Sequence, residues 1–445
     1  MTRTASRTCG DPGTVRPLTL FSRPLPLGAV FLLLCAVCAA AGAGDWTGSL
    51  SGESRVFLDD PRDGDQSGHT NLSLSGTATW VHEWPDSGQS LVFTPFGRLD
   101  QHDNWRTHAD LRELYWQKAA PRWELRLGLR KVHWGVAESQ RLVDVINQRD
   151  TIEALTGDEK LGQPMANFAW INPWGTLDLF WLPYFRGRTL TGRHGRFRTP
   201  VPMHHEPLYE SGAEEWNQDF AVRYAHYIGS WDFGLSHFHG TSRDHRYVPE
   251  IGPIRLTPGS PYSSWSGANI NSRLTRLFLS LPFARLIPYY DQIDQTGLDV
   301  QYTAGNWIWK AESIYRTGMN KDYGAVCAGF EYTFGGIFGT GADLGTLLEY
   351  NWDSRGKEAL TNFQNDLFLG GRLALNDVQS TSLLGGVFVD LESAALAFGL
   401  EGERRLGEDW KLSVEMRIFS NVPADDLLTF VRKDDYIQAT LTWYF

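Results

Sequence analysis

Apolar and polar side chains alternate along the last ten residues of the chain. One face of residues 436–445 carries Ile437, Ala439, Leu441, Trp443 and Phe445, whereas the other is polar or hydroxyl-bearing. Successive side chains of a β-strand point to opposite faces, so this segment predicts a strand with one apolar face. An uncovered aromatic edge would favour aggregation in a soluble protein. It is tolerated where the last strand pairs with the first and closes a barrel in lipid.

The same period recurs through the rest of the chain. The clearest case is residues 123–130, where apolar positions alternate with Glu124, Arg126 and Arg130. Charges at this spacing suit a strand whose second face meets water inside a barrel. Further strands are expected at 46–57, 71–83, 89–100, 108–118, 165–171, 175–185, 219–227, 231–239, 270–280, 286–293, 297–304, 306–316, 323–334, 346–352, 365–375, 381–391, 395–404 and 410–418.

The connections between these segments alternate in length. Short turns separate longer loops at about 58–69, 135–165, 186–214, 241–268, 354–364 and 421–433. Short turns at one end and long loops at the other are typical of outer-membrane barrels. We therefore predict an all-β protein, a single transmembrane antiparallel β-barrel of about 18 to 20 strands. The strand boundaries are hardest to place in residues 269–304. If two of the expected strands there are one, the barrel has fewer strands, and 16 is the lowest number considered.

The composition agrees with this architecture, because apolar residues on one face of each strand and polar residues on the other give a moderate mean hydropathy. Aromatic residues make up 13% of the chain, with 18 Trp, yet the mean hydropathy is only −0.32. No segment reaches the roughly 18 apolar residues that a spanning helix needs. The alternatives for 445 residues are two or three soluble domains, or a soluble β-sandwich that ends on a strand.

The long apolar run of the chain lies near its N-terminus. Arginines precede residues 27–38, and Ala41, Gly42 and Ala43 follow them. This order predicts a secretory signal peptide over residues 1–43 and a barrel over residues 44–445. Removal of the signal peptide leaves Cys327 as the one cysteine, so no internal disulfide can form.

Residues 132–150 carry a recognisable pattern. Trp134, Gly135 and Glu138 are followed by Asp144-Val145-Ile146-Asn147 and then Asp150. Here the chain resembles a set of uncharacterised porin-like proteobacterial outer-membrane barrels with the pattern W-G-x-x-(D/E), then D-V-I-N-P-x-D. Gln148 stands where that pattern has Pro, so the turn after Asn147 is expected to differ. The resemblance implies a barrel in the outer membrane and names no cargo.

The loop at 135–165 is too long for a simple turn, and loops of this size are usually functional. We expect it to fold into the lumen, where charges at a constriction select solutes. The candidate constriction residues in this loop are Glu138, Arg141, Asp144, Arg149 and Asp150. The alternative is that Arg141, Asp144 and Asp150 form structural ion pairs that only brace the wall. Lumen-facing arginines of the strands complete the candidate pore lining: Arg126, Arg130, Arg223, Arg316 and Arg417.

Residues 186–198 concentrate positive charge in an otherwise acidic chain. Five arginines occur in this short stretch: Arg186, Arg188, Arg193, Arg196 and Arg198. They could attract anionic solutes to the pore mouth, or bind lipopolysaccharide phosphates through bidentate contacts. We favour the lipopolysaccharide contact.

Catalytic and metal chemistry find little support in the sequence. His237 and His239 share one strand face, but no second group is identified that would complete a metal site. Ser236 and His237 are adjacent in a strand, so they point to opposite faces and cannot act as a dyad. We therefore expect no enzyme, no bound metal and no cofactor.

Taken together, these patterns predict a porin-like channel for diffusion of small solutes across the bacterial outer membrane. The alternatives are a transporter of lipid or hydrophobic compounds, and a structural or adhesive barrel without channel activity. Expected partners are outer-membrane lipid and lipopolysaccharide, a small solute, and the barrel assembly machinery through the strand that ends at Phe445. A homo-oligomer is compatible with the sequence, and no nucleic-acid partner is expected.

Overall fold

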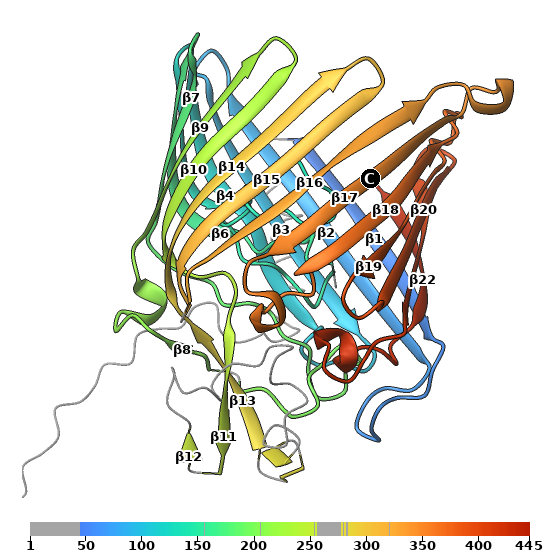
Figure 1. The fold of residues 1–445 in the computed structure, drawn as a ribbon. Coiled ribbons are helices and arrows are strands. Elements are labelled where there is room, and N and C mark those ends of the chain that lie inside the picture. Colours follow the sequence, from blue (N-terminus) through green and yellow to red (C-terminus); the bar gives the residue numbers. More distant parts are fainter. Residues whose placement is uncertain are drawn as a thin grey trace, which may run out of the picture.

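Eighteen antiparallel strands form one closed barrel (Figure 1). The computed structural model describes residues 45–154, 156–204, 206–252, 254–255, 277–278, 280–281, 284–319 and 321–445. The sheet closes because β1 (Asp45–Phe57) pairs with β2 (Thr70–Trp84) on one side and with β22 (Tyr436–Tyr444) on the other. This confirms the predicted fold class and the C-terminal strand. The predicted signal peptide lies outside the described residues.

The remaining wall strands follow one another around the barrel in chain order. They are β3 (Gln89–Asp100), β4 (His108–Ala120), β5 (Trp123–Arg130), β6 (Gln163–Asn172), β7 (Gly175–Leu182), β9 (Asp219–Ile228), β10 (Trp231–Thr241), β14 (Gln292–Ala304), β15 (Trp307–Gly318), β16 (Tyr323–Phe334), β17 (Asp343–Asp353), β18 (Asn365–Ala374), β19 (Ser382–Asp390), β20 (Leu396–Leu406) and β21 (Trp410–Ser420). Short 3₁₀ helices lie in the connections: η1 (Glu214–Trp216), η2 (Ile337–Gly339), η3 (Gly356–Glu358) and η4 (Leu427–Phe430).

A second, four-stranded sheet lies outside the wall, at the loop end (Figure 1). It contains β8 (Leu208–Tyr209), β11 (Arg246–Ile251), β12 (Ile254–Arg255) and β13 (Ala284–Tyr290). The expected barrel strand at 286–293 is therefore wrong. Leu286 and Ile287 are consecutive and both fully buried, whereas a barrel strand alternates between lipid and lumen. The expected strand at 270–280 falls mainly outside the described residues.

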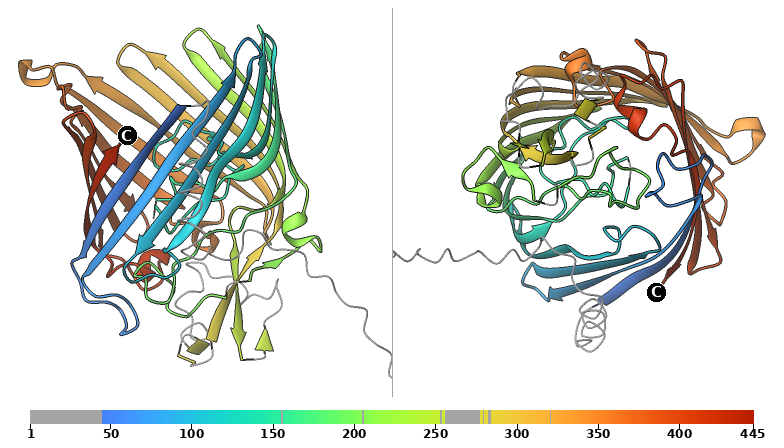
Figure 2. Two further views of the ribbon diagram at one scale, coloured as in Figure 1. Left: turned by 180° about the vertical axis from the view of Figure 1, so that it is seen from behind. Right: turned by 90° about the horizontal axis from the view of Figure 1, so that it is seen from below.

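Short turns and long loops gather at opposite ends of the barrel, as predicted (Figure 1). Two residues join β4 to β5, β6 to β7, β9 to β10 and β14 to β15, all at the end where β1 begins. At the other end, residues 131–162, 183–218 and 242–291 form the longest connections. Seen from that end, the described parts of these connections lie across part of the lumen (Figure 2).

The outer surface carries an apolar band between two aromatic girdles. Leucines such as Leu50, Leu235, Leu298 and Leu369 are exposed near the middle of their strands. Exposed aromatic residues mark both ends of the wall: Trp84, Trp170, Trp231, Trp307 and Trp410 near the turns, and Trp181, Phe220, Tyr315, Tyr350 and Trp352 towards the loops. An apolar band with aromatic girdles is the surface that a bilayer requires of a barrel.

The lumen face is polar and charged. On β1 and β3, Glu53 and Arg98 form an ion pair at 3.0 Å, and Arg106 from the next loop reaches the same carboxylate at 2.8 Å. These three side chains are almost completely buried inside the barrel. Among the described residues, no helix is long and apolar enough to cross a membrane.

Because each wall strand has a lipid face and a lumen face, an added charge should destabilise the barrel only on the lipid face. Leu298 lies near the middle of β14 on the outer face and is 43% exposed. Leu298→Arg should lower the free energy of unfolding in lipid vesicles by about 2–4 kcal/mol, because the cation would meet hydrocarbon near the midplane. The control is Gln301→Arg, on the opposite face of the same strand. Urea titration followed by the electrophoretic shift of the folded form measures both, and equal costs would contradict the assigned faces.

Candidate functional site

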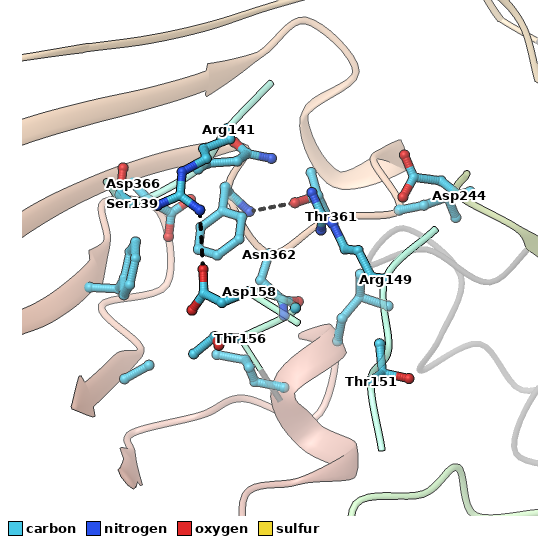
Figure 3. Close-up of a pocket in the computed structure, with 18 of the residues that line it drawn as sticks. Ser139, Arg141, Arg149, Thr151, Thr156, Asp158, Asp244, Thr361, Asn362 and Asp366 are labelled. Atoms are coloured by element: carbon cyan, nitrogen blue, oxygen red, sulfur yellow. Dashed lines mark hydrogen bonds and ion pairs between the residues drawn. The ribbon is translucent and has the colours of Figure 1, made fainter. Parts of the chain in front are cut away.

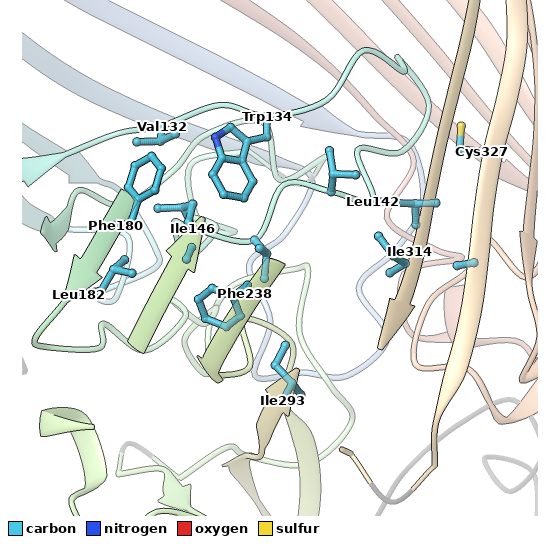
Figure 4. Packing of buried hydrophobic residues seen from close by; sticks show 14 of the residues in the cluster. Val132, Trp134, Leu142, Ile146, Phe180, Leu182, Phe238, Ile293, Ile314 and Cys327 are labelled. Carbon is cyan, nitrogen blue, oxygen red and sulfur yellow. The ribbon is translucent and has the colours of Figure 1, made fainter. Parts of the chain in front are cut away.

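The connection between β5 and β6 folds into the barrel, and we call residues 131–162 the inner loop. Val143 and Ile146 of this loop are fully buried, and Trp134 is 6% exposed. They belong to one apolar cluster with lumen-facing side chains of β7, β10, β14 and β15, including Phe180, Phe238, Ile293 and Ile314 (Figure 4). The Trp134 and Phe180 rings meet edge to face at 5.6 Å. The predicted inward loop is therefore anchored on one side of the wall by apolar packing.

Two wall carboxylates anchor the inner loop through its backbone. Glu312 on β15 accepts hydrogen bonds from the amides of Val136, Ala137 and Val143 at 2.6, 2.9 and 3.2 Å. Glu349 on β17 accepts from the amides of Glu138 and Ser139 at 3.0 and 2.7 Å. Both carboxylates are buried. Because buried amides need acceptors, these two side chains replace the β-ladder that a loop lacks.

The residues of the Trp134-Gly135 and Asp144–Asn147 pattern form the internal scaffold of the inner loop. Gly135 has a φ of +102°, and a Cβ there would lie 2.5 Å from the Glu312 carboxylate. The Asn147 side chain accepts from the Val132 amide at 2.8 Å and donates to the carbonyls of Arg130 and Leu161. These contacts fix the two ends of the loop beside each other at the wall.

The predicted constriction residues of the inner loop divide into two groups. Glu138, Arg141 and Arg149 line an open cavity beside the loop. Asp144 also borders the cavity, but its side chain is only 6% exposed and pairs with Lys160. Asp150 is fully buried, where it accepts from Arg112 at 2.6 Å and Thr189 at 2.6 Å. For Asp144 and Asp150 the structure thus favours the alternative of structural ion pairs.

Charge partners inside the protein determine the protonation of this scaffold. Burial alone would raise the pKa of Asp150, but the Arg112 guanidinium and the Thr189 hydroxyl bring that pKa below its usual range. Burial lowers the pKa of Lys160, and Asp144 offsets this only in part. Burial together with the nearby Arg188 lowers the pKa of His245 to about 3, so this imidazole is neutral at pH 7.

The five predicted wall arginines all face the lumen. Arg316 and Arg417 border the cavity, paired with Asp244 at 2.9 Å and with Glu401. Arg223 binds Asp299 at 2.6 Å and lies over the Trp134 ring, and it does not border the cavity. Arg126 pairs with Glu124, and Arg130 donates to Asn167 at 3.0 Å; neither borders this cavity. A pore role for these last two stays a prediction.

The arginines of segment 186–198, expected to contact lipopolysaccharide or anions, are bound to other parts of the protein. Arg196 is 2% exposed, and it binds Asp434 at 2.8 Å and the carbonyls of Asp59 and Lys433. The other arginines of the segment also have protein partners: Asp110 for Arg186, Asp244 for Arg188, Asp65 for Arg193 and Asp63 for Arg198. The segment crosses the barrel mouth and packs Phe197 against Phe57 of β1. Its buried arginines therefore link loops to one another, whereas the Arg193 side chain is 65% exposed. The lipopolysaccharide contact stays a prediction.

The open cavity has a volume of about 740 Å³ and lies between the inner loop and the wall from β15 to β21 (Figure 3). The cations around it are Arg141, Arg149, Lys160, Arg188, Arg198, Arg243, Arg316, Arg355 and Arg417. The anions are Glu138, Asp144, Asp158, Asp244, Asp353, Asp366, Asp390, Glu401 and Asp426. With nine charges of each sign, selectivity depends on which of them are already paired.

Sequence reasoning missed two kinds of residue at this site. Glu349 and Lys160 have no sequence signal that separates them from other strand and loop charges. Phe368 and Phe388 line the cavity from β18 and β19. Their position two residues from Asp366 and Asp390 on the same strands was the available signal, because side chains two apart share a face.

The histidines lie as the sequence indicated. His237 and His239 are on the outer face of β10 with Asp294 beside them, whereas Ser236 is buried on the opposite face. Within the described part of the chain, no group of three or more His, Cys, Asp or Glu side chains could hold a metal ion.

No protein-family model and no curated protein matches this chain. Solved structures give distant matches. One, described as asymmetric conductivity of engineered proteins, has a TM-score of 0.43 and 13% identity over 90% of this chain and 100% of that one. A mutant of the Rh. blastica porin gives a TM-score of 0.42 and 12% identity over the same shares. At these values the matches are too distant to indicate a shared function.

The carboxylate anchor predicts that the inner loop loosens when Glu312 loses its charge. Glu312→Gln keeps the shape but replaces one acceptor oxygen with a donor that faces the Val143 amide. Hydrogen bonds to a charged acceptor contribute roughly 1.5–3 kcal/mol each. We expect faster proteolysis within residues 131–162 and an unchanged barrel. Glu403→Gln, a lumen carboxylate that pairs with Lys411, is the control. Equal protection of the loop in both variants would contradict the anchor.

Proposed function

We propose that this protein is an outer-membrane channel for diffusion of small solutes, with the inner loop narrowing its pore. The observation that carries the proposal is the cavity of about 740 Å³ inside a closed barrel, lined by charged side chains. The apolar outer band and its aromatic girdles support a location in the bacterial outer membrane. A lumen lined by charge is suited to hydrated solutes.

The cavity charges without an ion-pair partner differ in sign between the inner loop and the wall. On the loop side, Arg149 borders the cavity but takes part in no ion pair among the described residues, unlike the other eight cations. Away from the inner loop, three cavity anions have no ion-pair partner among those residues: Asp366 and Asp390, which are buried, and the partly exposed Asp426. The loop side thus presents uncompensated positive charge to a passing solute. We propose that Arg149 gives the channel a preference for anions.

We also propose that this chain belongs to the porin-like proteobacterial set. The pattern around Trp134 and Asn147 supports membership of the porin-like proteobacterial set, since these residues build the inner-loop scaffold. Lipid and the barrel assembly machinery are the proposed partners, the latter through the strand that ends at Phe445. A structural or adhesive barrel without conductance is the alternative, and we propose no catalytic role.

Ion selectivity tests the role of Arg149. Arg149→Glu changes the pore charge by two units. At roughly 10 Å in a water-like dielectric this amounts to ~0.8 kcal/mol for a monovalent ion, unfavourable for an anion and favourable for a cation. The anion-to-cation permeability ratio should therefore fall about 15-fold. Reversal potentials across planar bilayers under a salt gradient measure the ratio. Arg404→Glu, which breaks a pair with Asp377 at the turn end, is the control.

Two outcomes would contradict the proposal. Purified protein that inserts into bilayers without any conductance would exclude the channel. Conductance with equal reversal potentials for the wild type and Arg149→Glu would leave the channel in place but remove Arg149 from its selectivity.

A further inference from the structure

Aromatic side chains line part of the lumen, where the wall of a water-filled pore is usually polar. The aromatic patch consists of Phe368 on β18, Phe388 on β19, Phe419 on β21 and Phe363 from the loop before β18. The Phe388 ring lies 4.5 Å from the Phe368 ring and 5.0 Å from the Phe363 ring. All four side chains border the cavity and remain partly exposed. Exposed rings in a charged pore require an explanation.

Glycines set the position of this patch on the wall. A Cβ at Gly386 would lie 2.5 Å from the Phe368 ring, and one at Gly370 would lie 3.0 Å from it. Neither glycine has a positive φ, so the close approach of the ring, not the backbone conformation, excludes a side chain. The ring therefore packs directly on bare backbone. A ring held in one position in this way is typical of a surface that contacts a ligand.

The inner loop presents positive charge to the same cavity. Arg149 is the cavity cation that has no ion pair among the described residues. Arg141 has only a long contact of 3.4 Å with Asp158, whose side chain is 66% exposed (Figure 3). Such an exposed pair holds its arginine weakly. Both guanidinium groups are thus available to an anionic ligand.

We infer that the cavity binds organic acids with an aromatic body, which place the ring on the aromatic patch and the carboxylate at Arg149 and Arg141. This inference rests on the proposed channel and names its substrate class. A small inorganic anion would leave the patch in contact with water, and an uncharged apolar compound would leave Arg149 without a partner. Ring stacking and a charge-assisted hydrogen bond together satisfy both surfaces.

A buried carboxylate fixes the orientation of such a ligand. Asp366 is 3% exposed and lies two residues from Phe368 on the same lumen face. Asp366 accepts from the Asn365 amide at 3.1 Å and has no ion-pair partner within the described ranges. Asp366 therefore offers no cation that could hold a ligand carboxylate on the wall side. The acid group therefore points to the inner loop and the ring to the wall.

Single-channel block tests the inference. Benzoate is the probe, acetate is the acid without the ring, and benzyl alcohol is the ring without the charge. In the wild type, benzoate should reduce the current at lower concentration than either of the others. The double variant Phe368→Ala, Phe388→Ala should raise the half-blocking concentration of benzoate about two- to tenfold and leave that of acetate unchanged. Arg149→Gln should weaken block by both acids and leave benzyl alcohol unaffected.

The control is Phe330→Ala on β16, whose ring contacts Trp309 on the outer wall at 5.1 Å. This variant should change none of the three values. Equal block by benzoate and acetate in a conducting wild-type channel would overturn the inference while the channel stands. So would stronger block by glucose, a neutral sugar, than by benzoate.

A separate readout covers a barrel that carries no current, an outcome that counts against the proposed function. Equilibrium dialysis of labelled benzoate against the folded protein in detergent reports the site directly. Saturable binding that the double variant loses would support the site, and its absence in the wild type would overturn it. The electrophoretic shift of folded barrels establishes that each variant is folded, and Phe388→Leu replaces the double variant if that protein does not fold.

Discussion

Pairing of β1 with β22 is the constraint on which the structure depends, because it leaves no strand edge in the wall. In hydrocarbon an unpaired backbone group has no water to bond to, so a spanning sheet must close. Closure in turn imposes two faces on every wall strand. One face meets lipid and carries the leucines and the aromatic girdles, and the other meets the lumen and carries the charges.

A barrel of eighteen strands encloses more space than side chains alone can fill. Here the inner loop occupies one side of that space. It is held as a small protein core would be, by apolar packing around Val143 and Ile146 and by acceptors for its buried amides at Glu312 and Glu349. Because the anchors lie on the wall up to β17, the space towards β18–β21 stays open as the cavity.

Charged side chains have different roles in different parts of the lumen. Asp150, Asp144 and Arg196 are buried with their partners and fix the loops. Breaking such a pair would leave a buried charge uncompensated, which is costly. Arg149 differs because it borders open space and has no such partner among the described residues. The same residue types therefore fix loops in one place and, as we propose for Arg149, bind ligands in another.

The sequence by itself determined the two-faced strands, their order and the ends at which turns and loops gather, because a period of two is local information. It also indicated that the loop expected at 135–165 turns inward, since its length and mixed composition do not suit an external turn. Only the tertiary structure decided which charges are paired. Arg196 meets Asp434 across 238 positions of the chain, and no local pattern distinguishes it from an arginine that faces lipid headgroups. The strand expected at 286–293 failed for a similar reason: its partner β11 comes from the same long connection, and only that pairing takes it out of the wall.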